Sequence, residues 1–146
     1  MPSVTIGPGD LNLQEDGPLV EVLFLISSEL EERYRKEKKE IPEPVVVKAL
    51  IDTGASMCLI QEDIPKKLGL EPVGTTKICT PSSKDHACYQ YFMRMAIPSH
   101  NLTYHGVFIA SPLQGQEIDC LIGRDLLKDG ILIYLGNANQ FTLSLL

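Results

Sequence analysis

The sequence lacks tryptophan and has little of several features that mark particular protein classes. Its four cysteines do not show the paired Cys-x-x-Cys spacing of a structural zinc site, and its three histidines are far apart with polar neighbours. We therefore expect no metal ion and no other cofactor. The cysteines are expected to be reduced thiols, most of them buried.

Long apolar runs and an excess of basic residues are also missing. The longest apolar run near the N-terminus, Val22 to Ile26, is too short to span a bilayer and follows acidic residues. The net charge is −6, and no basic stripe is interleaved with aromatic residues. Nucleic acids and membranes are therefore not expected partners. With neither a signal peptide nor a membrane anchor expected, the predicted location is cytoplasmic.

A chain of 146 residues suits one domain with a single core. Residues 1–18 carry several prolines and glycines, which predicts an irregular N-terminal arm or a loose first strand. Residues 19–146 are expected to form the domain proper. Within it, residues 27–44 hold charged side chains of alternating sign and predict a solvent-exposed insertion, either a loop or a short helix.

The remaining pattern predicts a mostly β domain, because short β-branched and apolar runs alternate with turn-forming residues. The expected strands cover residues 19–26, 45–51, 75–78, 88–97, 104–110, 118–122, 131–135 and 140–146. Residues 75–97 are predicted to form one long hairpin with a polar tip. A short helix is expected within residues 61–70 and a helical turn over residues 125–128.

One carboxylate stands at the end of an apolar strand. The run from Val45 to Ile51 delivers Asp52 to a turn made by Thr53 and Gly54, after which apolar residues resume. An Asp-Thr-Gly at a strand end is often only a turn, in which the Asp side chain accepts a local backbone hydrogen bond. The same arrangement also suits an active-site carboxylate on a rigid turn. The tripeptide alone leaves both interpretations open.

A short internal similarity accompanies this turn. Cys58-Leu59-Ile60 is matched 62 residues later by Cys120-Leu121-Ile122, and each triplet is followed by a polar segment with a helical pattern. Such a match predicts two copies of a strand, a turn and a short helix. The domain would then have an internal pseudo-two-fold axis.

These residues together resemble the retropepsin-like aspartic proteases, the single-lobe relatives of pepsin. The resemblance rests on Asp52-Thr53-Gly54-Ala55 after an apolar strand and on Leu121-Ile122-Gly123-Arg124-Asp125 later in the chain, and it covers residues 19–146. It implies a single-lobe closed β-barrel with a flap hairpin over residues 75–97. It also implies an aspartic endopeptidase that acts on peptides or proteins, with Asp52 as its catalytic residue.

Peptide hydrolysis by this route uses two carboxyl groups that share one proton. The sequence contains a single Asp-Thr-Gly, so the second carboxylate is expected from another copy of the chain. We therefore expect a homodimer in which the two Asp52 residues meet on the two-fold axis. The resemblance implies that Thr53 bonds across this axis and that Gly54 lets the substrate backbone approach. Ala55 agrees with the retroviral pattern and is expected to support the site.

The resemblance assigns further residues to substrate binding and to support of the site. The residues expected to contact substrate are Leu50, Ser56, Leu59, Thr80, Pro81, Ser82 and Leu121. Leu50 and Leu59 are explained nearly as well as ordinary core leucines. Gly123, Arg124 and Asp125 are expected to be structural, with the Arg124 guanidinium making hydrogen bonds near the subunit boundary.

Two features depart from the retroviral pattern. The expected flap tip contains no glycine, and Ser56 stands where the retroviral enzymes have an acidic residue that binds the substrate backbone. They leave open an alternative, a dimeric binding or scaffold protein with weak or no catalysis. The last run, residues 141–146, alternates apolar and polar side chains. It is expected either to pair across the dimer axis or to be an ordinary final strand within one subunit.

Overall fold

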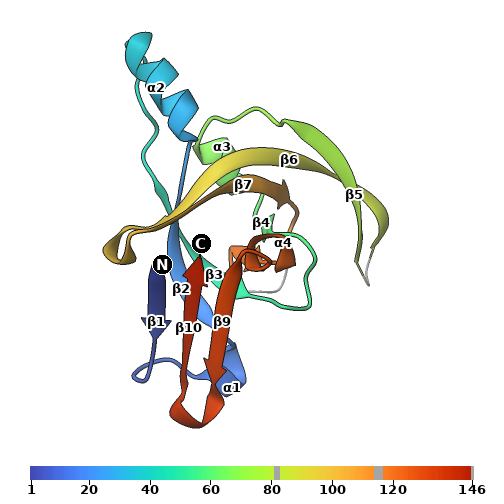
Figure 1. The fold of residues 1–146 in the computed structure, drawn as a ribbon. Coiled ribbons are helices and arrows are strands. Elements are labelled where there is room, and N and C mark those ends of the chain that lie inside the picture. Colours follow the sequence, from blue (N-terminus) through green and yellow to red (C-terminus); the bar gives the residue numbers. More distant parts are fainter. Residues whose placement is uncertain (81–82, 114–116, 146) are drawn as a thin grey trace.

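A computed structural model of the chain describes residues 1–80, 83–113 and 117–145. The strands in these ranges are β1 (Ser3–Ile6), β2 (Leu19–Leu25), β3 (Val45–Ile51), β4 (Leu59–Ile60), β5 (Gly74–Thr80), β6 (Ser83–Ile97), β7 (Leu102–Ala110), β8 (Cys120–Ile122), β9 (Gly130–Leu135) and β10 (Gln140–Leu145) (Figure 1). The helices are α1 (Leu13–Asp16), α2 (Ser28–Lys36), α3 (Asp63–Lys67) and α4 (Arg124–Leu127), with single 3₁₀ turns η1 (Pro98–His100) and η2 (Gly136–Ala138).

Six strands close into a barrel in the order β2-β3-β8-β4-β7-β6. The barrel closes because β2 pairs with β3 along one edge and with β6 along the other, where Leu23 to Leu25 lie opposite Ala96 to Arg94. The predicted mostly β, closed-barrel fold is therefore confirmed.

The barrel is filled by side chains that alternate along its strands. On β2, for example, Val20, Val22 and Phe24 are buried, whereas Glu21 between them is exposed. Phe24 packs edge-on against Phe108 of β7, with ring centroids 4.9 Å apart. Full burial of an aliphatic or aromatic side chain contributes roughly 1.5–3 kcal/mol, so this interior dominates the stability of the barrel.

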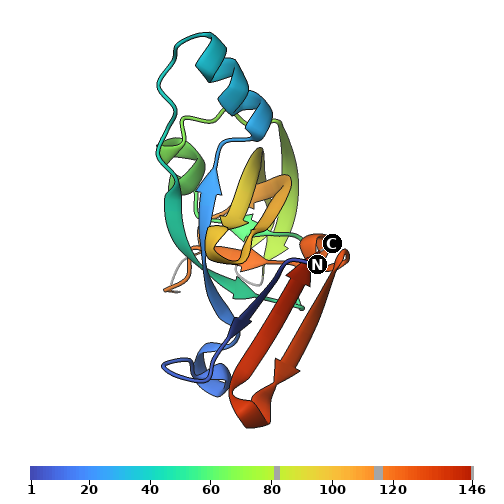
Figure 2. The same cartoon turned by 60° about the vertical axis from the view of Figure 1, so that its left-hand side comes forward.

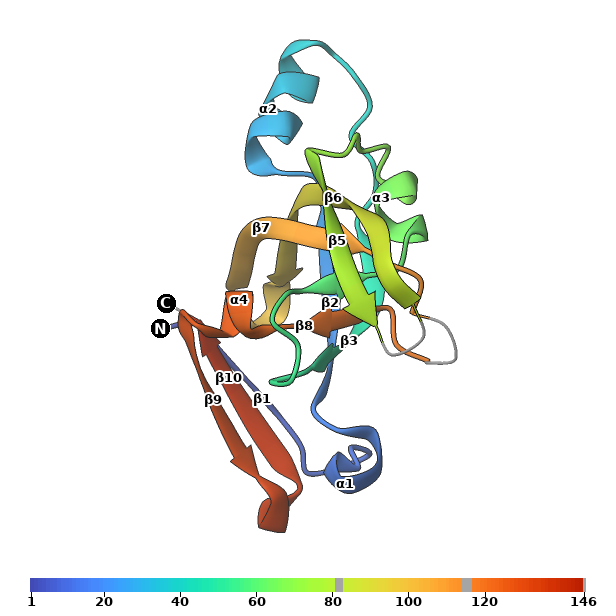
Figure 3. The same ribbon diagram turned by 90° about the vertical axis from the view of Figure 1, so that its right-hand side faces the viewer.

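A second, three-stranded antiparallel sheet joins the two ends of the chain in the order β1-β10-β9. Val4 of β1 lies opposite Leu143 of β10, and both side chains are buried. Residues 3–6, part of the predicted N-terminal arm, therefore form a paired strand. In three views the sheet lies at the opposite end of the molecule from α2 (Figures 1, 2 and 3).

The internal similarity in the sequence agrees with the strand pairing. β3 runs parallel to β8 and β4 runs parallel to β7, while β4 and β8 pair antiparallel with Leu59 opposite Leu121. Equivalent hydrogen bonds extend both parallel pairs, since Asp52 N donates to Ile122 O and Ser111 N donates to Ile60 O, both at 2.9 Å. The two copies therefore lie next to each other, related by an approximate two-fold axis.

The charged insertion contains a helix, as one of the two alternatives predicted. Ser27 caps α2, since its Oγ accepts a hydrogen bond from Leu30 N at 3.2 Å. None of the side chains of α2 itself is buried. In the described ranges no helix has the length and apolar character needed to cross a membrane.

The predicted long hairpin is formed by β5 and β6. β6 is the longest strand, and its second half pairs with β7 and β2 in the barrel while its first half pairs with β5. The hairpin arches beyond the barrel on the side where α4 lies (Figure 1).

Candidate active site

Asp52 follows the last residue of β3 and begins a tight turn. Its backbone carbonyl accepts a hydrogen bond from Ala55 N at 3.1 Å, and its Oδ1 accepts one from Gly54 N at 2.9 Å. The side chain of Asp52 is half-buried, whereas Thr53 and Gly54 are exposed. The carboxylate therefore has a defined orientation on a turn that faces solvent.

The segment after β8 supports this turn along its length. Arg124 N donates to Ala55 O at 2.9 Å, and Asp125 N donates to Ser56 O at 3.2 Å. The Arg124 guanidinium donates from Nη1 to Thr53 O at 2.6 Å. Arg124 thus makes hydrogen bonds within its own chain, and its predicted place near the subunit boundary stays a prediction. These contacts bind carbonyl groups on both sides of Gly54 and therefore stabilise the turn.

Asp125 anchors the end of the same loop through Cys58. Its Oδ2 accepts a hydrogen bond from Cys58 N at 3.2 Å, and its Oδ1 accepts from Cys58 Sγ at 3.1 Å and Leu126 N at 2.9 Å. The Sγ in turn accepts from Gly123 N at 3.3 Å. The sequence predicted that most of the cysteines are buried thiols but not this contact, because side-chain pairing over 67 residues leaves no local signal.

Burial raises the pKa of the Cys58 thiol to about 12, and the neighbouring Asp125 carboxylate adds to the effect. Burial also raises the pKa of Cys120 well above its ordinary value. Alkylation by iodoacetamide requires the nucleophilic thiolate, so both residues should resist this reagent at pH 8 in the folded protein and react once urea unfolds it. Peptide mass mapping after timed labelling measures this. Labelling of Cys58 at the same rate in both states would contradict the described packing.

Gly123 fits a site that no larger residue can occupy. A Cβ at this position would lie 2.6 Å from the backbone carbon and oxygen of Met57 and 2.9 Å from its nitrogen. Its φ of −96° is open to any residue, so the restriction comes from the close packing of two backbone segments. The expected structural role of Gly123 is consistent with this contact.

Three leucines form a row on one face of the sheet beside Asp52. Leu50 lies opposite Leu121, and Leu121 lies opposite Leu59, across β3, β8 and β4. All three are half-buried, while their neighbours Ile51 and Ile60 are buried on the other face. The predicted apolar residues are therefore brought together next to the turn, where they present an apolar surface.

The other predicted contact residues are less well grouped. Ser56 is exposed at the far end of the loop from Asp52. Thr80 is the last residue of β5. Pro81 and Ser82 lie outside the described residues. Among the residues that the structure describes, no group of three or more His, Cys, Asp or Glu side chains could hold a metal ion.

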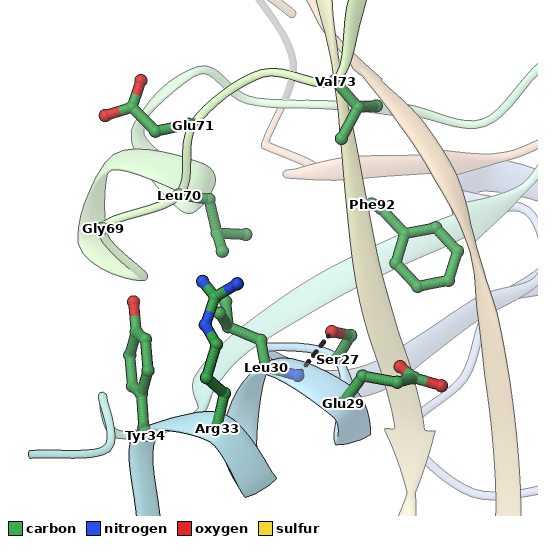
Figure 4. Close-up of a pocket in the computed structure, with 10 residues that line it drawn as sticks. All are labelled: Ser27, Glu29, Leu30, Arg33, Tyr34, Gly69, Leu70, Glu71, Val73 and Phe92. Atoms are coloured by element: carbon green, nitrogen blue, oxygen red, sulfur yellow. Dashed lines mark hydrogen bonds between the residues drawn. The ribbon is translucent and has the colours of Figure 1, made fainter. Parts of the chain in front are cut away.

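The surface has one hollow beside this turn and another that is remote from it. A cavity of about 360 Å³ is lined by Thr53, Arg124, Leu127, Lys128 and Leu132, directly beside the turn. A larger hollow of about 530 Å³ lies between α2, the segment after α3, and β6, with Glu29 and Glu71 among its lining residues (Figure 4). The second hollow is built from elements that make no contribution to the Asp52 turn.

A closed barrel with one Asp-Thr-Gly turn, supported by the segment from Gly123 to Asp125 that follows β8, defines the single-lobe, retropepsin-like class of aspartic protease. The comparisons agree. Residues 41–126 match the family model described as aspartyl protease, and the chain belongs to this family. A crystal structure of a retropepsin-like aspartic protease from Rickettsia conorii is similar in fold, with a TM-score of 0.60 and 15% sequence identity over 98% of this chain and 90% of that chain. A search of curated protein sequences gave no match.

Proposed function

We propose that the protein is an aspartic endopeptidase that works as a homodimer through the Asp52 carboxylates of its two subunits. The observation that carries this proposal is the single half-buried Asp52 on a turn hydrogen-bonded at both ends, beside an apolar row of leucines. Each chain offers one such carboxylate, and the chemistry requires two. A monomer would therefore be inactive.

In the proposed reaction, one ionised Asp52 removes a proton from a water molecule whose oxygen attacks the peptide carbonyl carbon. The other Asp52 is protonated and donates to the carbonyl oxygen, because two carboxyl groups so close cannot both ionise. As the resulting gem-diol collapses and the carbon–nitrogen bond breaks, the leaving nitrogen takes the proton that the first Asp52 removed from water. One hydroxyl of the gem-diol returns a proton to the second Asp52, which restores the starting pair. The Gly54 N–H, 2.9 Å from Oδ1, keeps each carboxylate oriented through these steps.

The residues around the turn have matching proposed roles. The exposed Thr53 side chain has no hydrogen-bond partner among the described residues and is free to bond to the partner's turn. Leu50, Leu59 and Leu121 would contact apolar substrate side chains. The β5–β6 hairpin would close over the bound peptide, and Ser56 would lie near the substrate backbone. Thr80, Pro81 and Ser82, which are consecutive in the sequence from the last residue of β5 to the residue before β6, remain predicted substrate contacts.

The dimer surface is proposed to include the free edge of β9. β10 pairs with β1 on one side and β9 on the other, so the last strand belongs to one subunit and has no free edge. β9 instead exposes large apolar side chains, which are Ile131, Ile133, Tyr134 and Leu135. An open edge with this composition favours pairing with a second chain. Leu132 of the same strand lines the cavity beside Thr53, so β9 lies next to the Asp52 turn.

Placing a charge on this surface should separate the subunits. In Ile133→Lys an ammonium group replaces a side chain that is 47% exposed and would be buried between the two copies. We expect the dimer dissociation constant to rise by at least about 100-fold, corresponding to about 3 kcal/mol, with a parallel loss of peptide cleavage. Analytical ultracentrifugation and a peptide cleavage assay at the same concentrations measure the two effects.

Val73→Lys is the matched control, because Val73 is also exposed (62%) and lines the hollow next to α2, at the other end of the molecule from β9. Its dimer affinity and cleavage rate should remain those of the wild type. An Ile133→Lys protein that sediments as a monomer and still cleaves peptides at the normal rate would rule out the two-chain site.

A further inference from the structure

A third cavity, of about 460 Å³, opens beside the leucine row. Its walls come from α1, the start of β2, β3 and the two residues before Asp119. Leu50 belongs to both the cavity and the row, so the two surfaces are continuous. A Cβ on Gly17 would lie 2.9 Å from Leu50 Cδ1, which shows how closely the turn after α1 packs against this side chain.

The position of the cavity relates it to Asp52. Lys48 and Leu50 both line it and point to the same face of β3, because side chains alternate along a strand. Asp52 follows two residues after Leu50, about 7 Å further along the chain at the usual rise per residue. An extended peptide also presents every second side chain to one side, at the same spacing. A peptide cleaved at Asp52 would therefore present a side chain close to its scissile bond to this cavity.

The lining combines an apolar floor with carboxylates. Leu19, Leu50 and Ile118 supply the apolar part. The lining includes three carboxylate residues, Glu15, Asp16 and Glu117, and one ammonium residue, Lys48, so the cavity has an excess of two negative charges. Within the described residues, none of these four side chains forms an ion pair.

Lys48 also has an acidic neighbour outside the cavity. Glu21 lies directly opposite Lys48 in the β2–β3 register and is exposed on the same face. The surroundings of the cavity are therefore acidic as well. Such a lining suits a long basic side chain, whose methylene stem packs on apolar surface while its charged head meets carboxylates.

We propose that this cavity is a substrate subsite that selects an arginine or lysine side chain near the scissile bond. The inference rests on the proposed protease function and adds a substrate preference to it. The three carboxylates would be the specificity-determining groups, and Lys48 would limit the preference by repelling a second cation.

The test compares peptides that carry arginine or its uncharged analogue citrulline at each position flanking the cleaved bond. At low salt we expect the kcat/KM of the arginine peptide to exceed that of the citrulline peptide about tenfold at one position. A ratio of this size corresponds to the interaction free energy of one or two partly screened charge pairs. The ratio should fall to about 1 in Glu15→Gln/Asp16→Asn/Glu117→Gln and rise in Lys48→Gln. Because the arginine-to-citrulline ratio is measured separately for each variant, a general change in its activity does not affect the comparison.

Glu29→Gln/Glu71→Gln is the control for the change in net charge, since both residues line the separate hollow beside α2 (Figure 4). It should keep the wild-type ratio. Binding of the same peptides to the Asp52→Asn protein, measured by fluorescence anisotropy, provides a readout that does not need catalysis. The dissociation constants should show the same preference for arginine.

The outcomes separate the two proposals. Cleavage by the wild type with an arginine-to-citrulline ratio below about 2 at every position, or a ratio that survives the triple substitution, would overturn the subsite and leave the protease proposal standing. Preferential binding of arginine peptides without cleavage by the wild type would support the subsite and refute the protease. Absence of both binding and cleavage would overturn both.

Discussion

Asp52→Asn is expected to lower the rate of peptide cleavage by about 10⁴-fold or more, because general acid and base catalysis depend on this group in both subunits. An amide can neither accept the proton of the attacking water nor share a proton with the opposite carboxylate. The substitution keeps the shape of the side chain, and the amide oxygen can still accept from Gly54 N. The turn and the dimer should therefore survive. Initial rates with a fluorogenic peptide set measure the loss.

Asp10→Asn provides the control, since Asp10 is exposed and makes no described side-chain contact. It removes the same charge and should retain wild-type activity. Circular dichroism and sedimentation would establish that both variants keep the fold and the subunit association. Activity of Asp52→Asn close to that of Asp10→Asn would refute the assignment of Asp52.

Gly123→Ala is expected to lower the free energy of unfolding by about 3 kcal/mol or more. The added methyl group would clash with backbone atoms, which cannot move aside as a flexible side chain could. The new Cβ would lie 2.6 Å from backbone atoms of Met57, and these belong to the loop that carries Asp52. Relief of the clash must move either this loop or β8. We therefore expect a lower urea midpoint and a loss of cleavage activity in the fraction that remains folded.

Gly136→Ala is the control that shows whether replacing a less closely packed glycine by alanine also destabilises the protein. A Cβ at Gly136 would meet Tyr134 Cε1 at 3.4 Å, an ordinary contact, so the change in unfolding free energy should stay within about 1 kcal/mol. Urea unfolding followed by tyrosine fluorescence compares the two variants. Equal midpoints for Gly123→Ala and the wild type would show that the two backbone segments are less closely packed than described.

Much of the barrel could be predicted from the sequence, because its strands carry local periodic signals. The alternation at Val20, Val22 and Phe24 marks a strand without reference to its partners. The turn at Asp52 was predictable for the same reason, since Thr53 and Gly54 follow directly on an apolar strand. The matched triplets at Cys58 and Cys120 predicted two copies of one unit, and the strand pairing places these copies side by side. These features depend on residues close together in sequence.

The remaining features depend on contacts between distant segments. β1 carries only a few apolar residues, and its place in a sheet follows from pairing with β10, 141 residues away at Ser3 and Ser144. The bond from Cys58 to Asp125 and the cavity that joins α1 to Leu50 arise in the same way. The sequence pattern left residues 141–146 either as a dimer strand or as an ordinary final strand, whereas β10 has both edges paired within the chain and the free edges of this sheet belong to β1 and β9.

The two-chain nature of the active site is tested most directly by mixing subunits. Wild-type and Asp52→Asn chains are exchanged at equal amounts and fixed total concentration, and the cleavage rate is compared with that of the wild type alone. If one carboxylate from each chain is required, only wild-type homodimers are active, and about a quarter of the activity should remain. A rate close to half of the wild-type value would mean that each chain acts on its own, which would contradict the account.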